Sequence, residues 1–152
     1  HNPTPGYQTV DQYPGSDYQL DVTKGLPFAD NSVGVIRAFD FLEHIPIGQV
    51  VPFMNECYRV LAPGGWMLTS TPSTDGRGAF QDPTHVSFWN ANSFWYYTQQ
   101  QHRKYVPDIT ARFQLTRLHN YFPSDWHARN NIPYVAADLW AIKGQEVCGV
   151  VS

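Results

Sequence analysis

Residues 33–45 read Val-Gly-Val-Ile-Arg-Ala-Phe-Asp-Phe-Leu-Glu-His-Ile, and this stretch decides the fold class. Its first seven residues form a nearly continuous apolar run, which is typical of a buried parallel strand. From Gly48 to Leu61, apolar residues recur at spacings of three and four, as they do on one face of an amphipathic helix. Residues 63–65 (Pro-Gly-Gly) end that helix, and residues 66–71 return to a strand pattern. Strand, helix and strand in this order predict a right-handed βαβ unit, and therefore an α/β domain.

Further strand candidates lie on both sides of this unit. Gly6–Asp11 and Tyr18–Asp21 are short β-prone runs, and each ends in an aspartate. Residues 111–121 and 134–143 alternate well enough to predict an antiparallel strand pair that closes an otherwise mostly parallel sheet. Residues 72–90 form a long loop, and loops of this length are more often functional than idle.

The composition excludes some classes of function and favours others. A chain of 152 residues with 42% hydrophobic residues fits one domain, residues 1–152, with a single core. The net charge of −3 and the scattered basic residues give no reason to expect duplex DNA as a partner. No apolar run approaches the roughly 20 residues of a membrane span. Cys57 and Cys148 lie too far apart for a disulfide framework, which favours a cytoplasmic protein. The composition does not decide between a monomer and a homo-oligomer.

Three motifs follow one another in a fixed order. Residues 26–28 read Leu-Pro-Phe, residues 42–44 read Leu-Glu-His, and residues 59–65 read Arg-Val-Leu-Ala-Pro-Gly-Gly. This order and spacing resemble class I S-adenosylmethionine-dependent methyltransferases, over most of residues 6–143. The resemblance implies a Rossmann-like sheet, S-adenosylmethionine as cofactor and methyl transfer as activity. The family's first strand and its Gly-x-Gly turn are missing from the chain, so we expect an N-terminally incomplete domain whose first strand lies upstream of His1.

The resemblance also implies where the cofactor binds. Asp11, at the end of the second strand, would accept hydrogen bonds from both ribose hydroxyls. Asp21 and the backbone of Val22 would hold the adenine, and Phe39 and Asp40 would meet the methionine portion. For both Asp11 and Asp21, a local turn or cap is the alternative interpretation.

Asp40, Glu43 and His44 suggest a metal site. They are three and four residues apart, so one helical turn would place all three on one face. Carboxylates and an imidazole suit Mg²⁺ or Mn²⁺, and His85 in the long loop is the natural fourth ligand. The arrangement is similar to metal-dependent O-methyltransferases, although those families usually have Glu where this chain has Asp40. Without a metal, His44 or His85 could be a general base or a substrate contact, or both could be structural.

The leading hypothesis for function is methyl transfer to a hydroxyl oxygen of a small-molecule, sugar or nucleotide acceptor. Methyl transfer from a sulfonium is an in-line displacement, and a hydroxyl acceptor must also lose its proton to a metal-assisted or histidine base. One alternative is a degenerate, non-catalytic methyltransferase-like module for binding or assembly. Another is a hydrolase or lyase that consumes the cofactor. Residues 76–78 (Gly-Arg-Gly) are interpreted as a hinge, and Arg77 as a contact for an anionic acceptor.

Overall fold

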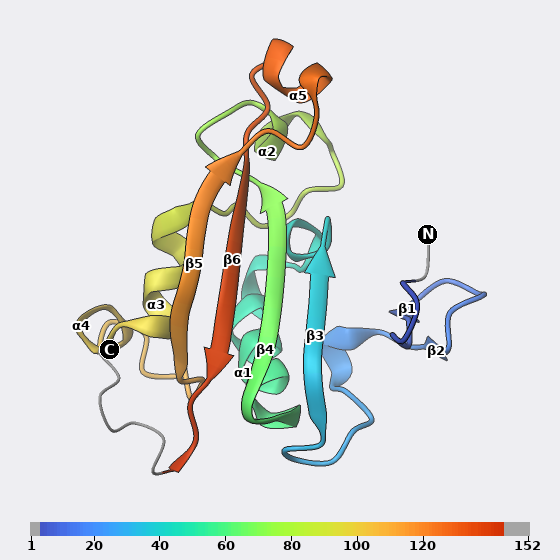
Figure 1. The fold of residues 1–152 in the computed structure, drawn as a ribbon, viewed down its shortest axis with the longest axis vertical. Coiled ribbons are helices and arrows are strands. Elements are labelled where there is room, and N and C mark those ends of the chain that lie inside the picture. Colours follow the sequence, from blue (N-terminus) through green and yellow to red (C-terminus); the bar gives the residue numbers. More distant parts are fainter. Residues whose placement is uncertain (1–3, 145–152) are drawn as a thin grey trace.

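The computed structural model describes residues 4–144, which form a mixed main sheet, a smaller second sheet and several helices. The main sheet has the strand order β3-β4-β6-β5 (Figure 1). Its strands are β3 (Val33–Phe39), β4 (Leu61–Pro72), β6 (Tyr134–Ala141) and β5 (Phe113–Tyr121). Strands β3 and β4 are parallel, and β6 pairs antiparallel with both β4 and β5. The α/β class, the βαβ unit and the antiparallel closing pair are therefore confirmed.

The two N-terminal strands are shorter than predicted and lie in a separate sheet. Strand β1 (Val10–Asp11) pairs in parallel with β2 (Tyr18–Gln19). Figure 1 shows this pair beside β3, on the side away from β4. Within residues 4–144, no strand pairs with that edge of β3. The expected strand upstream of His1 stays a prediction.

Strand β3 is less buried than its apolar sequence predicts. Only Ala38 is buried, whereas Val35 is 37% and Phe39 is 44% exposed. In the described part of the chain, its outer edge has no partner strand. Helix α1 (Val50–Val60) lies behind the main sheet in Figure 1. Strand β3 is parallel to β4 as predicted, but the prediction of a buried strand is wrong for residues 4–144, because only one face of β3 is covered.

Helix α1 (Val50–Val60) connects β3 to β4 and follows the 3-10 turn η3 (Ile47–Gln49). It buries an apolar face formed by Val50, Phe53, Met54, Cys57 and Val60. The predicted helix is confirmed, but it ends at Val60, before the Pro-Gly-Gly segment. That segment instead belongs to β4, where the pairing with β3 shifts between Val33↔Leu61 and Val35↔Trp66. Such a bulge bends the start of the strand.

The Leu-Pro-Phe turn is held against α1 by two charged side chains. The backbone N–H of Leu26 donates to Glu56 Oε1 at 3.0 Å. The Arg59 guanidinium donates to the Leu26 carbonyl at 3.1 Å, to the Phe28 carbonyl at 2.9 Å and to Asp30 Oδ1 at 2.7 Å. Two of the three sequence motifs are therefore in contact, which explains physically why they occur together.

The core lies between α1 and the main sheet. Its fully buried residues include Leu42, Met54, Met67, Val135 and Leu139. Cys57 is also fully buried as a free thiol, and burial raises the pKa of this thiol. Cys148 lies outside the described residues. Within residues 4–144, no helix is long and apolar enough to cross a membrane.

The remaining helices are short. After the 3-10 turns η1 (Val22–Lys24) and η2 (Leu42–His44), the long loop contains α2 (Gly78–Gln81). Three short helices follow one another along the next part of the chain: η4 (Ala91–Phe94), α3 (Trp95–Thr98) and α4 (Gln100–Arg103). Helix α5 (Asp125–Arg129), between β5 and β6, was not predicted.

The Gly-Arg-Gly segment makes close contacts instead of forming a hinge. A Cβ atom on Gly76 would lie 2.3 Å from Pro133 Cδ and 2.8 Å from the Asn131 carbonyl oxygen. A Cβ atom on Gly78 would lie 2.4 Å from Ile132 Cγ2. The two glycines therefore allow the long loop to pack against the segment between α5 and β6, and the hinge interpretation is wrong.

Candidate functional site

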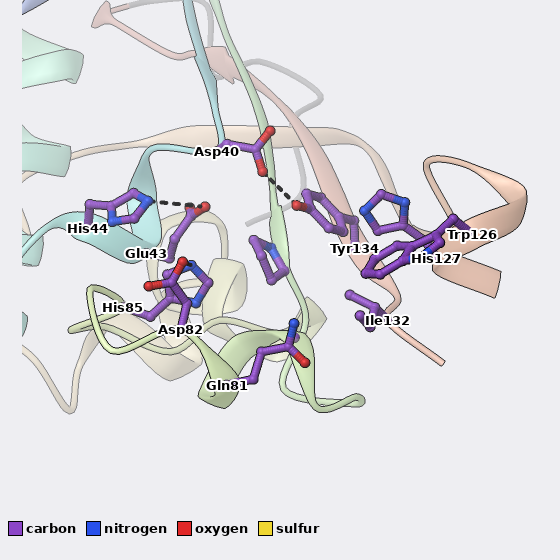
Figure 2. A pocket seen from close by; sticks show the side chains of 12 residues that line it. Asp40, Glu43, His44, Gln81, Asp82, His85, Trp126, His127, Ile132 and Tyr134 are labelled. Carbon is purple, nitrogen blue, oxygen red and sulfur yellow. Dashed lines mark hydrogen bonds and ion pairs between the residues drawn. The ribbon is translucent and has the colours of Figure 1, made fainter. Parts of the chain in front are cut away.

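A pocket of about 300 Å³ lies where β3 and β4 end. In open α/β sheets, ligands bind at the carboxyl ends of the parallel strands, so this is the expected location for a site. Three segments supply its walls: the turn after β3, the long loop with α2, and α5 with the start of β6 (Figure 2). The lining residues are Asp40, Glu43, His44, Pro72, Gly78, Gln81, Asp82, His85, Trp126, His127, Ile132 and Tyr134.

Glu43 is a buried carboxylate in the wall of this pocket. Glu43 is only 2% exposed, because η2 turns inward onto the core. Glu43 Oε2 accepts a hydrogen bond from Thr71 Oγ1 at 2.7 Å, and Glu43 Oε1 lies 3.8 Å from His44 Nε2. Burial raises the pKa of the Glu43 carboxyl, which the nearby negative charge of Asp40 raises further. A buried carboxylate of this kind is stabilised by a cation.

His85 reaches Glu43 and His44 because the long loop is anchored to η2. The backbone N–H groups of Val86 and Ser87 both donate to the Glu43 carbonyl, at 2.8 and 3.1 Å. The imidazole rings of His44 and His85 then lie 5.1 Å apart between centroids, at 75°. Glu43, His44 and His85 each offer one ligand atom, and these atoms lie within 4.8 Å of one another. Three of the four residues predicted as metal ligands are therefore in one cluster.

Both histidines are held in the tautomer that leaves Nε2 free. His44 Nδ1 lies 3.2 Å from the Thr84 carbonyl oxygen, and His85 Nδ1 lies 3.1 Å from the Ala79 carbonyl oxygen. A carbonyl oxygen only accepts, so each Nδ1 carries a proton, and in the neutral imidazole each Nε2 then carries the lone pair. His85 Nε2 also lies 3.7 Å from Asp82 Oδ2. Metal-binding histidines in proteins almost always have such an N–H partner behind the ring.

Asp40 lies outside this cluster, so its prediction as a metal ligand is not supported by the geometry. Helix η2 begins only at Leu42, and Asp40 has a left-handed backbone with φ of +50°. The residues therefore do not share one helical turn. Asp40 Oδ1 instead accepts a hydrogen bond from the Tyr134 hydroxyl at 2.7 Å, across the pocket from His44 (Figure 2). Burial and the Asp40 carboxylate raise the pKa of Tyr134.

The residues expected to bind the cofactor do not line this pocket, except for Asp40. Asp11 Oδ1 accepts from the Tyr13 N–H at 3.2 Å. Asp21 caps η1, where it accepts from the N–H and hydroxyl of Thr23, and these bonds lower the pKa of Asp21. Val22 begins η1, and Phe39 at the end of β3 is packed under the Arg37 guanidinium, 4.3 Å from the ring centroid. Local capping is thus present at both aspartates, and their cofactor roles stay predictions.

The aromatic wall of the pocket was missed by sequence reasoning. His127 on α5 packs edge-to-face on Tyr134, with ring centroids 5.5 Å apart at 90°, and Trp126 packs edge-to-face on His127. The Ser124 hydroxyl caps α5 by accepting from the His127 N–H. This N-cap was the available signal, since a serine before a short polar run predicts a helix start.

Two comparisons of sequence bear on the family of the chain. Residues 7–69 match the family described as "Methyltransferase domain". A protein of Mycolicibacterium smegmatis (strain ATCC 700084 / mc(2)155), described as a probable S-adenosylmethionine-dependent methyltransferase, is 37% identical over 84 residues. That match covers 53% of this chain and 32% of the relative. The resemblance to class I S-adenosylmethionine-dependent methyltransferases that the three motifs predict is therefore confirmed.

Solved structures agree with this methyltransferase fold. The methyltransferase bound to the Trm112 methyltransferase activator of Haloferax volcanii has a TM-score of 0.63 at 13% identity, over 88% of this chain and 71% of that one. The N-methyltransferase NodS of Bradyrhizobium japonicum WM9, in complex with S-adenosyl-L-homocysteine, has a TM-score of 0.55 at 12% identity, over 88% and 65%. At these identities, the likeness shows the fold alone. The chain matches about a third of the length of its curated relative.

Proposed function

We propose that this domain transfers a methyl group from S-adenosylmethionine to a hydroxyl oxygen of an acceptor that binds in the pocket beyond β3 and β4. The observation that carries the proposal is the cluster of Glu43, His44 and His85 in that pocket. A methyl acceptor needs a group that lowers the cost of losing its proton, and the cluster supplies such a group.

The donor set of the cluster fits a divalent cation. It offers one buried carboxylate, Glu43, and two imidazoles whose Nε2 lone pairs are free. This mixture of nitrogen and oxygen ligands suits Mn²⁺ or Zn²⁺ more than Mg²⁺, which prefers oxygen. A bound cation would act there as a Lewis acid that lowers the pKa of an acceptor hydroxyl.

Other residues of the chain orient the side chains of the cluster for the reaction. The Thr84 and Ala79 carbonyls orient the two imidazoles, and the Thr71 hydroxyl orients Glu43. In the transfer, a bond forms between the acceptor oxygen and the methyl carbon while the carbon–sulfur bond breaks, so alignment supplies much of the acceleration. S-adenosylmethionine would bind beside this pocket, along the ends of β1, β2 and β3, with Asp11 at the ribose and Asp21 and Val22 at the adenine.

The same tautomers support a metal-free version of this function. A free Nε2 lone pair on His44 or His85 is also what a general base requires. In that case, the hydroxyl proton would pass directly to an imidazole, and Glu43, 3.8 Å from His44 Nε2, would stabilise the imidazolium that results.

The test measures S-adenosylhomocysteine formation with phenol, sugar and nucleoside acceptors, after EDTA treatment and after addition of Mn²⁺. We expect S-adenosylhomocysteine to form with at least one hydroxyl acceptor, EDTA to reduce the rate, and Mn²⁺ to restore it. His85→Ala should remove the response to Mn²⁺, whereas His119→Ala, on an exposed part of β5, should keep it. Full activity in EDTA would favour the histidine base. Product formed without any acceptor would indicate cofactor hydrolysis or lysis, and cofactor binding without product would indicate a binding module.

A further inference from the structure

The pocket walls have an unbalanced charge. Asp40, Glu43 and Asp82 all line the pocket, and among its lining residues in the described chain none is lysine or arginine. The exposed Asp82 accepts hydrogen bonds from the N–H and the hydroxyl of Thr84. Even a divalent cation at the Glu43 cluster would leave the two aspartates without a lysine or arginine partner in the wall. A negative pocket repels anions and attracts cations.

The nearest basic residue of the long loop does not change this charge. Arg77 precedes the pocket-lining Gly78, but its Nε donates to the Asn130 carbonyl at 3.0 Å, and Arg77 itself does not line the pocket. The interpretation of Arg77 as a contact for an anionic acceptor therefore has no support from its position.

The wall on α5 is apolar, aromatic and fixed in place. Trp126 is 53% exposed at the pocket, although large apolar side chains are usually buried. Its backbone carbonyl accepts from Asn130 Nδ2 at 2.8 Å, and the Ile132 N–H donates to the His127 carbonyl at 2.9 Å. The His127 ring is held by the Ser124 hydroxyl, 2.7 Å from Nδ1. Figure 2 shows Trp126, His127 and Tyr134 side by side on the wall facing Asp40 and Glu43.

We infer that the acceptor is a flat, ring-bearing molecule that is neutral or positively charged, and that acceptors with a phosphate or carboxylate beside the ring are excluded. This inference rests on the proposed function for the identity of the pocket as the acceptor site. The ring packs against the aromatic wall, where Trp126 offers an exposed face. Aromatic faces bind rings and cations, and the carboxylates of the opposite wall favour cations in addition. Of the acceptors considered from sequence, the nucleotide is therefore the least compatible.

The test compares three phenols of nearly the same shape: tyramine (cation), 4-ethylphenol (neutral) and 4-hydroxyphenylacetate (anion). Their affinities are measured by NMR titration of the full chain with S-adenosylhomocysteine present, and with EDTA so that no ligand coordinates a metal. Ligands of this size bind at roughly millimolar affinity. We expect tyramine to bind at least about tenfold more tightly than 4-hydroxyphenylacetate, with 4-ethylphenol between them.

Two kinds of variant locate the effect. Trp126→Ala should weaken all three phenols by about tenfold without changing their order, and Trp126→Phe should keep most of the affinity. Trp66→Ala, in the middle of β4 and not in the pocket lining, is the control and should bind as the native chain does. Asp82→Asn should reduce the preference for tyramine over the anion. Circular dichroism of each variant checks that it is folded.

Several results would overturn the inference. These are an anion that binds as tightly as tyramine, an unchanged affinity in Trp126→Ala, or no binding by any of the phenols at about 10 mM. Because binding is measured without turnover, a failure to transfer methyl groups would count against the proposed function only. Efficient methyl transfer to a phosphate- or carboxylate-bearing ring would count against this inference only.

Discussion

The ring of His85, in the loop after β4, lies 5.1 Å from the ring of His44, in the turn after β3. The contact exists because two backbone N–H groups of the loop donate to the carbonyl of Glu43, the residue beside His44. The short turn η2 thus supplies the side chains of Glu43 and His44 to the cluster. It also supplies the backbone carbonyl that anchors the loop carrying His85.

Addition of Mn²⁺ should stabilise the chain against heat. A ligand at a hundred times its dissociation constant contributes about 2.7 kcal/mol, which corresponds to a rise in Tm of about 5–10 °C for a domain of this size. The rise should be absent in Glu43→Gln and His85→Ala and retained in His119→Ala. Differential scanning calorimetry measures it, and an equal rise in His85→Ala would show that Mn²⁺ binds elsewhere.

Tyr134→Phe should lower the free energy of unfolding by about 1 kcal/mol, because it removes the hydroxyl that donates to Asp40 Oδ1. This bond holds together the start of β6 and the turn after β3, where Asp40 has a positive φ. Tyr13→Phe, at a residue that is 67% exposed, should change stability by much less. Urea denaturation compares the two variants, and equal effects would mean that the Asp40 contact contributes nothing.

Glu56→Gln should lower stability at pH 7 by about 1–2 kcal/mol, because the charged carboxylate binds both Arg59 and the Leu26 N–H. The hydrogen bond from Arg59 lowers the pKa of Glu56 below its ordinary value of 4.5. A lowered pKa in the folded state stabilises above the unfolded pKa, and this contribution is lost as the pH falls through the folded pKa. The stability difference between the native chain and Glu56→Gln should therefore be constant above about pH 5.5 and shrink below pH 4.5.

Gly76→Ala should destabilise the domain by about 1–3 kcal/mol, because its Cβ would overlap Pro133 and the Asn131 carbonyl. Gly48→Ala is the matched control, since nothing lies within 4 Å of a Cβ there. The control should be neutral or slightly stabilising. If Gly76→Ala unfolds at the same urea concentration as the native chain, the long loop does not pack against residues 131–133 as described.

Much of the architecture follows from local patterns. The spacing of Val50, Met54 and Cys57 predicts α1, and the alternation in residues 111–121 and 134–143 predicts β5 and β6. These signals are visible because each element must turn one apolar side to the core. The burial of β3 is not local, since it depends on which neighbours cover the strand, and its prediction failed for that reason.

The methyltransferase resemblance, the βαβ unit and the residue types of the cluster can be predicted from local patterns, because periodicity and motif spacing are properties of a short stretch of chain. Tertiary structure alone decided that His85 joins Glu43 and His44, and that Asp40 turns to Tyr134 instead. It also decided that α5 supplies the aromatic wall of the pocket. Each of these contacts joins residues far apart in the chain, and its geometry depends on loop packing and on one left-handed backbone angle that no spacing rule specifies.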